Sequence, residues 1–277
     1  VRLAGGFGTI AQDPAIDAAS NNHAKYVASN YFTLVNGGYP NLGSLYLIDP
    51  STGQLNAHVE NVTWPLFTGI GPKDRISAAG GQQYANAGEV MSFSAPRSCV
   101  GDLLNSVFHR SALLMTSTQF VGFGLQTTRT VAHPAGADVC AIEYGFKGQG
   151  NTRPSNWLGV YPGQGQTNVP VAMPIGEAPD PAPEVPNSSK GSPVSIYLND
   201  RVATVDSFTL TANGSATSVP VKRITSADFP NYVGYSTVHI LPTQPLAKGT
   251  LYNVSFKGSL SNGQTVGKDW SFTTTLN

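Results

Sequence analysis

The sequence has little charge and no block of basic residues. Only 12% of its 277 residues are Asp, Glu, Lys or Arg, and acidic and basic residues balance at 16 each. Binding to a phosphate backbone needs clustered Lys and Arg, so this composition argues against nucleic acid as a partner. Apolar runs also stay far below the roughly 20 residues that a membrane-spanning helix needs. We therefore expect no nucleic-acid partner and no transmembrane segment.

Cysteine is almost absent, because Cys99 and Cys140 are the only two. No C-x-x-C or Cys/His spacing typical of zinc accompanies them. They are either two buried free thiols or one disulfide. The even count in a low-charge chain rich in Asn and Thr favours a disulfide formed in an oxidising compartment. The chain opens on Val1 without the regions of a signal peptide, so we expect that an export signal lay upstream.

The first part of the chain has helical patterns followed by strand patterns. Asp13 and Pro14 suit the cap and first turn of a helix, whose apolar stripe includes His23, interpreted as a buried structural histidine. Further helices are expected at 72–79 and 99–114. Strands are expected at 120–125, 139–144 and 158–161. Helices first and strands afterwards indicate an α+β layer sandwich.

The composition changes at a proline-rich run, 174–193, which predicts a semi-rigid linker. Short alternating strands separated by turn residues follow it and predict an all-β sandwich. We therefore predict a first domain at 1–173, the linker at 174–193 and a sandwich domain at 194–277. His239 lies in the middle of one of the late strands, and its alternation with apolar neighbours predicts an exposed structural residue.

Candidate site residues gather in the first domain. His58 and His109 could bind Zn²⁺ or another divalent metal through neutral imidazoles, which would leave a position for water. Glu89 could orient or deprotonate that water, which makes it the candidate catalytic residue. Two histidines without a local H-E-x-x-H are weak support for metal. Arg75 and Arg110 are interpreted as ion-pair partners that fix loops.

The segments "AHVENVTWPLFTG", "GEV" and "SVFHR", with the later "GFG", resemble the CAP family (cysteine-rich secretory, antigen 5, pathogenesis-related) in its bacterial secreted form. The resemblance runs from about residue 2 to about residue 183. It implies an α-β-α sandwich with a cleft lined by two His and two Glu. His58, Glu89 and His109 match three of those positions, so we expect the three to converge in one solvent-open cleft.

The chain departs from the family pattern at two places. Ser106 occupies the position of the second Glu, and Val90 replaces the Asn of the family's "GEN" motif. Glu60, two residues after His58, either substitutes for the missing Glu or is a solvated loop acid. The closing segment "PLAKGTLYNVSFKGSLSNGQTVGKDWSFTT" resembles a bacterial Ig-like module.

Two functions follow from these residues and from the resemblance. The favoured one is a secreted or surface-exposed, non-enzymatic protein that binds a small ligand or a protein partner in a cleft formed by His58, Glu60, Glu89 and His109. The alternative is a metal-dependent hydrolase of peptide or cell-wall material. The missing second Glu favours binding, because one Glu would otherwise have to orient the ligand and accept the proton.

Overall fold

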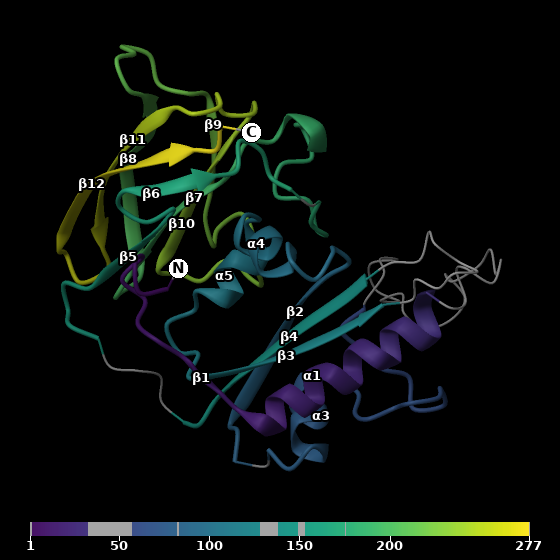
Figure 1. Cartoon of the computed structure of the whole chain (residues 1–277). Helices are drawn as coiled ribbons and strands as arrows, with labels where there is room; N and C mark the ends of the chain where they lie inside the picture. The colour runs from purple at the N-terminus through teal and green to yellow at the C-terminus, as the bar shows by residue number, and fades with distance from the viewer. Residues whose placement is uncertain are drawn as a thin grey trace. The chain divides into compact units, whose positions relative to one another are not determined.

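The computed structural model describes residues 2–32, 57–81, 83–127, 138–148, 153–174 and 176–276. The chain divides into two compact units, which are described separately (Figure 1). The helix–sheet unit comprises Ile10–Leu103 and Met115–Asn151. The sandwich unit comprises Val1–Thr9, Leu104–Leu114 and Thr152–Asn277. Each unit is therefore assembled from segments that are distant in the sequence.

The helix–sheet unit contains one four-stranded sheet in the order β1-β3-β4-β2. β1 runs parallel to β3, and the other pairs are antiparallel. Helices α1 and α3 pack against this sheet (Figure 1). The elements are β1 (Ala11–Gln12), α1 (Pro14–Val27), the π-helical turn η1 (Ala28–Phe32), α3 (Pro72–Ala78), β2 (Asn86–Ser92), α4 (Cys99–Leu104), β3 (Phe120–Thr127) and β4 (Asp138–Phe146).

The predicted start of the first helix is confirmed. Asp13 has an extended backbone, and its carboxylate accepts hydrogen bonds from the N–H groups of Ala15 and Ile16 at 2.9 and 3.3 Å. Pro14 fills the first helical position, where a missing N–H costs nothing. These contacts satisfy amides that the helix itself leaves unpaired.

Two glycines of β3 let the backbone of α1 lie directly on the sheet. A Cβ at Gly122 would come within 2.2 Å of the carbonyl carbon of Ile16. A Cβ at Gly124 would come within 2.0 Å of the carbonyl oxygen of Ser20. Any side chain at either position would push the helix away, so the G-x-G of the sequence is a packing motif.

The predicted disulfide is confirmed. Cys99 and Cys140 are bonded, with their Cα atoms 6.3 Å apart. The bond ties the start of α4 to β4, as the sequence predicted. It closes a loop with a sequence separation of 41.

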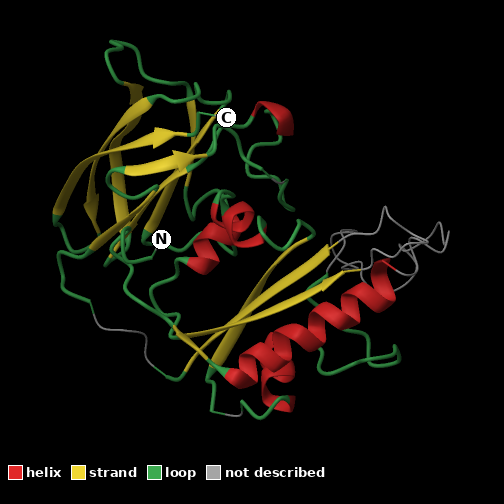
Figure 2. Ribbon diagram, in the orientation of Figure 1, coloured by secondary structure: helices red, strands yellow, loops and turns green. Residues whose placement is uncertain are grey.

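The sandwich unit contains two four-stranded sheets, in the orders β5-β7-β10-β9 and β6-β12-β11-β8 (Figure 2). Residues of both sheets form one apolar core that includes Ile196, Ile240, Phe256 and Phe272. The elements are α5 (Phe108–Leu113), β5 (Leu158–Tyr161), β6 (Gln166–Val169), the 3-10 turn η3 (Asn187–Ser189), β7 (Val194–Leu198), β8 (Val202–Ala212), β9 (Val221–Ile224), β10 (Thr237–Pro242), β11 (Leu251–Leu260) and β12 (Thr265–Thr274).

The domain boundaries predicted from the sequence differ from these units. β5 and β6, assigned to the domain at 1–173, pair with β7 and β12 of the sandwich. The segment at 174–193 is packed and does not act as a spacer. Ala182 and Lys190 are fully buried, and the Lys190 ammonium binds Asp180 and Asn187. Proline keeps named strands and α-helices out of the described part of this segment, which contains only the short turn η3, but it does not prevent packing.

The predicted fold class, an α+β chain with a CAP-type α-β-α sandwich, is wrong. The described residues are mostly β, and α1 is the only described helix longer than seven residues. The helix expected at 99–114 is two short helices, α4 and α5. Two sets of contacts interrupt the helix between α4 and α5. The Leu104 carbonyl accepts a hydrogen bond from the Arg110 guanidinium. The backbone amides of 107–109 donate to the Glu177 carboxylate and not to carbonyls of the preceding turn. Only the β-sandwich of the later chain is present as expected.

Replacing Gly124 with Ala should separate α1 from β3. We expect the free energy of unfolding to fall by about 3 kcal/mol, as for overpacked cores. Urea unfolding monitored by circular dichroism measures it. Gly101→Ala in α4 is the matched control, because a Cβ there meets nothing within 4 Å. The control should be neutral or slightly stabilising. Equal stability of Gly124→Ala and the wild type would contradict the close approach.

Candidate functional site

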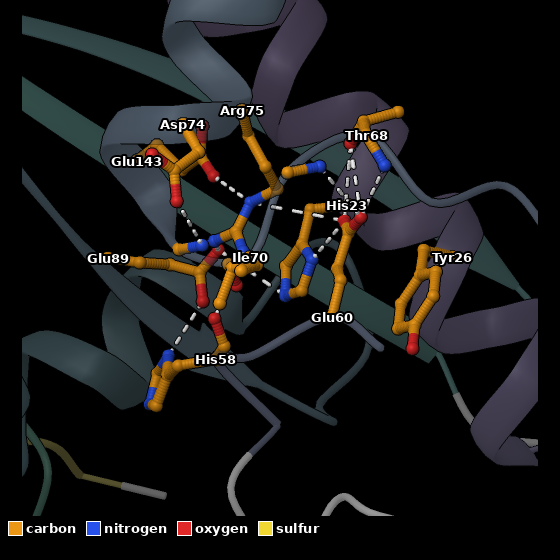
Figure 3. A network of polar contacts seen from close by, with 12 residues as sticks. His23, Tyr26, His58, Glu60, Thr68, Ile70, Asp74, Arg75, Glu89 and Glu143 are labelled. Atoms are coloured by element: carbon orange, nitrogen blue, oxygen red, sulfur yellow. Dashed lines mark hydrogen bonds and ion pairs between the residues drawn. The ribbon is translucent and has the colours of Figure 1, made fainter. Parts of the chain in front are cut away.

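A buried guanidinium joins two strands of the helix–sheet unit. Glu89 on β2 and Glu143 on β4 are direct partners in the antiparallel register, and both side chains are buried. Two like charges in opposite positions destabilise a sheet. Arg75 of α3 offsets this, since its Nη2 donates to Glu89 at 2.8 Å and its Nε to Glu143 at 2.6 Å (Figure 3). The expected ion-pair role of Arg75 is thus confirmed.

The same guanidinium holds the loop that carries His58. Nη1 of Arg75 donates to the carbonyl oxygen of His58 at 3.0 Å and to that of Ile70 at 3.4 Å. The Glu60 amide also donates to the Ile70 carbonyl, at 3.0 Å. The backbone of 58–70 is therefore closed on itself and attached to α3 through one side chain.

Glu60 belongs to this buried network and is not the solvated loop acid that the sequence left as one alternative. Its carboxylate accepts from the Thr68 amide at 2.6 Å and from the Gly69 amide at 3.3 Å. It also binds Nδ1 of His23 at 2.8 Å. With its side chain fully buried, Glu60 fixes the loop and presents no group to solvent.

His23 is a buried structural histidine, as predicted. Its Nδ1 faces the Glu60 carboxylate, and its Nε2 faces the Ala57 carbonyl at 2.9 Å. Both ring nitrogens therefore have a partner within the protein, and the imidazole presents no group to solvent.

His58 is the member of the network that reaches solvent. Its side chain is 44% exposed, whereas the Glu89 side chain is 1% exposed. His58 Nδ1 lies 2.6 Å from Glu89 Oε1. Figure 3 shows the imidazole at the edge of the network, with its second ring nitrogen turned away from Glu89. The sequence predicted that these two residues share a site, and the structure brings them together.

The surrounding charges keep Glu89 ionised. Burial by itself would raise its pKa, but the positive charges of His23 and Arg75 and the hydrogen bond from His58 outweigh burial. They lower the pKa of Glu89 to about 2. Its two oxygens are occupied by His58 and Arg75. Glu89 is therefore a weak base that orients its partners.

The pKa of Glu143 is shifted in the opposite direction. Burial raises its pKa to about 8, against the pull of Arg75 and with a further contribution from the Glu89 charge. Its Oε2 is buried and has no hydrogen-bond partner among the described residues, so a proton there costs less than a bare negative charge. With Glu143 protonated, Glu89 is the ionised carboxylate of the strand pair that faces Arg75.

His109 lies in the sandwich unit, on α5. Its Nδ1 binds Glu177 Oε1 at 2.9 Å and contacts the Ser106 hydroxyl at 3.2 Å. The Glu177 carboxylate also accepts the amides of 107–109. The carboxylate beside His109 is thus Glu177, from the segment predicted to be a linker. Because the two units are described separately, the convergence of His109 with His58 and Glu89 stays a prediction.

The prediction that His239 is exposed is wrong. His239 is fully buried, with Nδ1 2.7 Å from the Ser195 hydroxyl and Nε2 2.8 Å from that of Ser111. Burial and the nearby Arg110 charge lower its pKa to about 3. The guanidinium of Arg110 also binds Ser195 and the Pro193 carbonyl. Both faces of β10 are covered, so strand alternation alone could not show which side is exposed.

Sequence reasoning missed Glu143 and Glu177. Glu143 carried a usable signal, because it is one acid inside the apolar run "VCAIEYGF", and buried acids need a partner. Glu177 carried none, since acids in a proline-rich segment are usually solvated.

The described residues contain no group of three or more His, Cys, Asp or Glu side chains that could hold a metal ion. None of the described helices is long and apolar enough to cross a membrane.

Comparisons with known proteins assign no family to the chain. No family model and no curated protein matches the chain. Among solved structures, PcoC, a methionine-rich copper resistance protein from Escherichia coli, is 14% identical, with a TM-score of 0.30 over 44% of this chain and 99% of its own. CopC from Methylosinus trichosporium OB3b is 16% identical, with a TM-score of 0.28 over 43% of this chain and 93% of its own. Likenesses of this strength fix neither fold nor function.

Replacing Glu143 with Gln should change how stability depends on pH. The unfolded chain loses the Glu143 proton near pH 4.5 and the folded chain near pH 8. The contribution of Glu143 is therefore fully present below pH 4.5 and is lost as pH rises to 8. We expect Glu143→Gln to gain stability relative to the wild type across this window, by at most about 1.4 kcal/mol per pH unit.

Urea unfolding at half-unit steps from pH 4.5 to 8.5 measures this difference. Glu184→Gln is the control, because Glu184 is exposed and its pKa is lowered by Lys222, so its contribution changes only in the acid range. A difference between Glu143→Gln and the wild type that stays constant with pH would show that folded Glu143 is ionised.

Proposed function

We propose that the surface at His58 binds a small apolar ligand or peptide, and that the protein is an exported binding module that carries out no reaction on it. The observation that carries this proposal is the pairing of a 44% exposed imidazole with a buried carboxylate at 2.6 Å. Such a pair presents one oriented polar group at the surface.

Glu89 sets the orientation of the His58 ring. An ionised carboxylate accepts a hydrogen bond, so Nδ1 of His58 carries a hydrogen. The Arg75 contact to the His58 carbonyl fixes the backbone below the ring. The exposed imidazole is therefore held in one orientation, and a ligand that contacts it need not order the ring.

The character of Glu89 favours binding over hydrolysis. A general base works best when its pKa lies near the working pH. Glu89 has a pKa of about 2, is buried, and uses both oxygens within the protein. It is thus suited to holding His58 in place and poorly suited to activating water.

The loop after His58 gives the apolar character. Val62, Leu66 and Ile70 are 67%, 53% and 57% exposed. Leu66 has a φ of 66°, a left-handed conformation that is unfavourable for a residue with a bulky side chain. The Arg75 guanidinium binds the carbonyls of both Ile70 and His58, which keeps the Ile70 end of this loop beside the backbone of His58. A ligand with an apolar group and a polar group suits this combination.

Export is supported by the disulfide, since such bonds persist in oxidising compartments. The resemblance to the CAP family supports the same proposal. The motif residues His58, Glu60, Arg75 and Glu89 all belong to one network here. We propose that this likeness concerns the motif and the binding role.

The test is titration of the protein with a blocked leucine-containing tripeptide, followed by ¹H–¹⁵N NMR. We expect shifts at His58 and along 61–70. His58→Ala should weaken binding about tenfold, the loss of one hydrogen bond worth about 1.4 kcal/mol. Lys257→Ala, an exposed residue of β11, is the control and should bind as the wild type does.

The same samples with Zn²⁺ distinguish the alternative. Cleavage of the peptide or of cell-wall fragments that needs Zn²⁺, His58 and His109 together would establish the hydrolase. Binding that His58→Ala leaves unchanged would place the ligand elsewhere and refute the proposed site.

A further inference from the structure

The sandwich unit has a groove of about 580 Å³ between strands β8 and β9, within the range of ligand-binding sites. β8 is the outermost strand of one sheet and β9 the outermost strand of the other. The groove is lined by Arg201, Arg223 and Tyr235, together with residues 202–205 of β8. None of these residues belongs to the His58 network.

The groove holds more positive than negative charge. Arg201 and Arg223 are exposed, and neither guanidinium forms an ion pair with a described residue. Asp228 is the only acid in the lining, and its Oδ2 is turned to the amide and hydroxyl of Thr225, at 2.8 and 3.0 Å. Two cations without a carboxylate partner favour an anionic ligand.

The other lining groups suit a sugar. Tyr235 is 56% exposed, and the Arg201 guanidinium lies over its ring, 4.6 Å from the centroid. This stacking gives the arginine a fixed plane from which to bind a carboxylate. The polar residues Thr204, Thr225 and Ser226 also line the groove. We propose that this groove binds an acidic oligosaccharide whose uronate carboxylates meet Arg201 and Arg223.

The backbone disfavours the competing occupant, an acidic peptide added as a strand. The part of the β8 edge that lines the groove is already occupied at two points, because the Val202 amide donates to the Tyr235 carbonyl and the Arg223 guanidinium donates to the Val205 carbonyl. Its pairing with β11 is also irregular between Lys257 and Gly258 and again between Ser259 and Leu260. Bulges and covered edges block strand addition, whereas side-chain recognition of a sugar needs no free edge.

Calorimetric titration of the whole protein with trigalacturonate tests this proposal. We expect binding that weakens at high salt, as charge pairing requires. Arg201→Ala and Arg223→Gln should each weaken it at least tenfold. Gln keeps a donor for the Val205 carbonyl and removes only the charge. Lys257→Ala is the matched control, an exposed cation outside the groove, and should change affinity less than twofold.

Neutral galactotriose and hexaglutamate complete the experiment. The uncharged sugar should bind at least tenfold more weakly than trigalacturonate. Equal binding of the two sugars, or no binding of either, would overturn the proposal. Hexaglutamate binding more tightly than trigalacturonate would identify a peptide site instead. Circular dichroism of each variant confirms the native fold, so that a lost affinity reports on the groove.

Discussion

The helix–sheet unit depends on one buried guanidinium. Arg75 binds a carboxyl group on each of two paired strands, and it also binds two carbonyl groups of the loop that carries His58. A lysine in the same place would be a single point charge and could not hold four groups in fixed directions. Without this fork, Glu89 and Glu143 would lose the donor that they share, and the loop would lose its attachment to α3.

The charges around Arg75 explain how a buried cluster can orient His58 at the surface. When Glu143 keeps its proton, the cluster buries one negative charge fewer beside the Arg75 guanidinium. Glu89 then remains ionised and holds His58 in one orientation. The sandwich unit handles its buried histidine differently, because His239 is kept neutral between two hydroxyl groups.

Local signals in the sequence predicted local structure well. Asp13–Pro14 predicted a helix start, two cysteines predicted a disulfide, and the resemblance to the CAP family implied a site shared by His58 and Glu89. Features that depend on distant segments could not be predicted. Strands β5 and β6 join a sheet formed mainly by the later chain, and Glu177 breaks a helix almost 70 residues earlier by binding its amides. The local sequence around β5, β6 and Glu177 contains no pattern that indicates these long-range contacts.

The protonation of Glu143 is the most direct test of this account. Side-chain ¹³C NMR of the Glu carboxyl groups, assigned with Glu143→Gln and Glu89→Gln, follows each titration separately. The account predicts that Glu143 titrates near pH 8 and Glu89 near pH 2. Titration of Glu143 at or below pH 4.5 would show that the folded protein buries a second ionised strand carboxylate beside Glu89, and it would contradict this account.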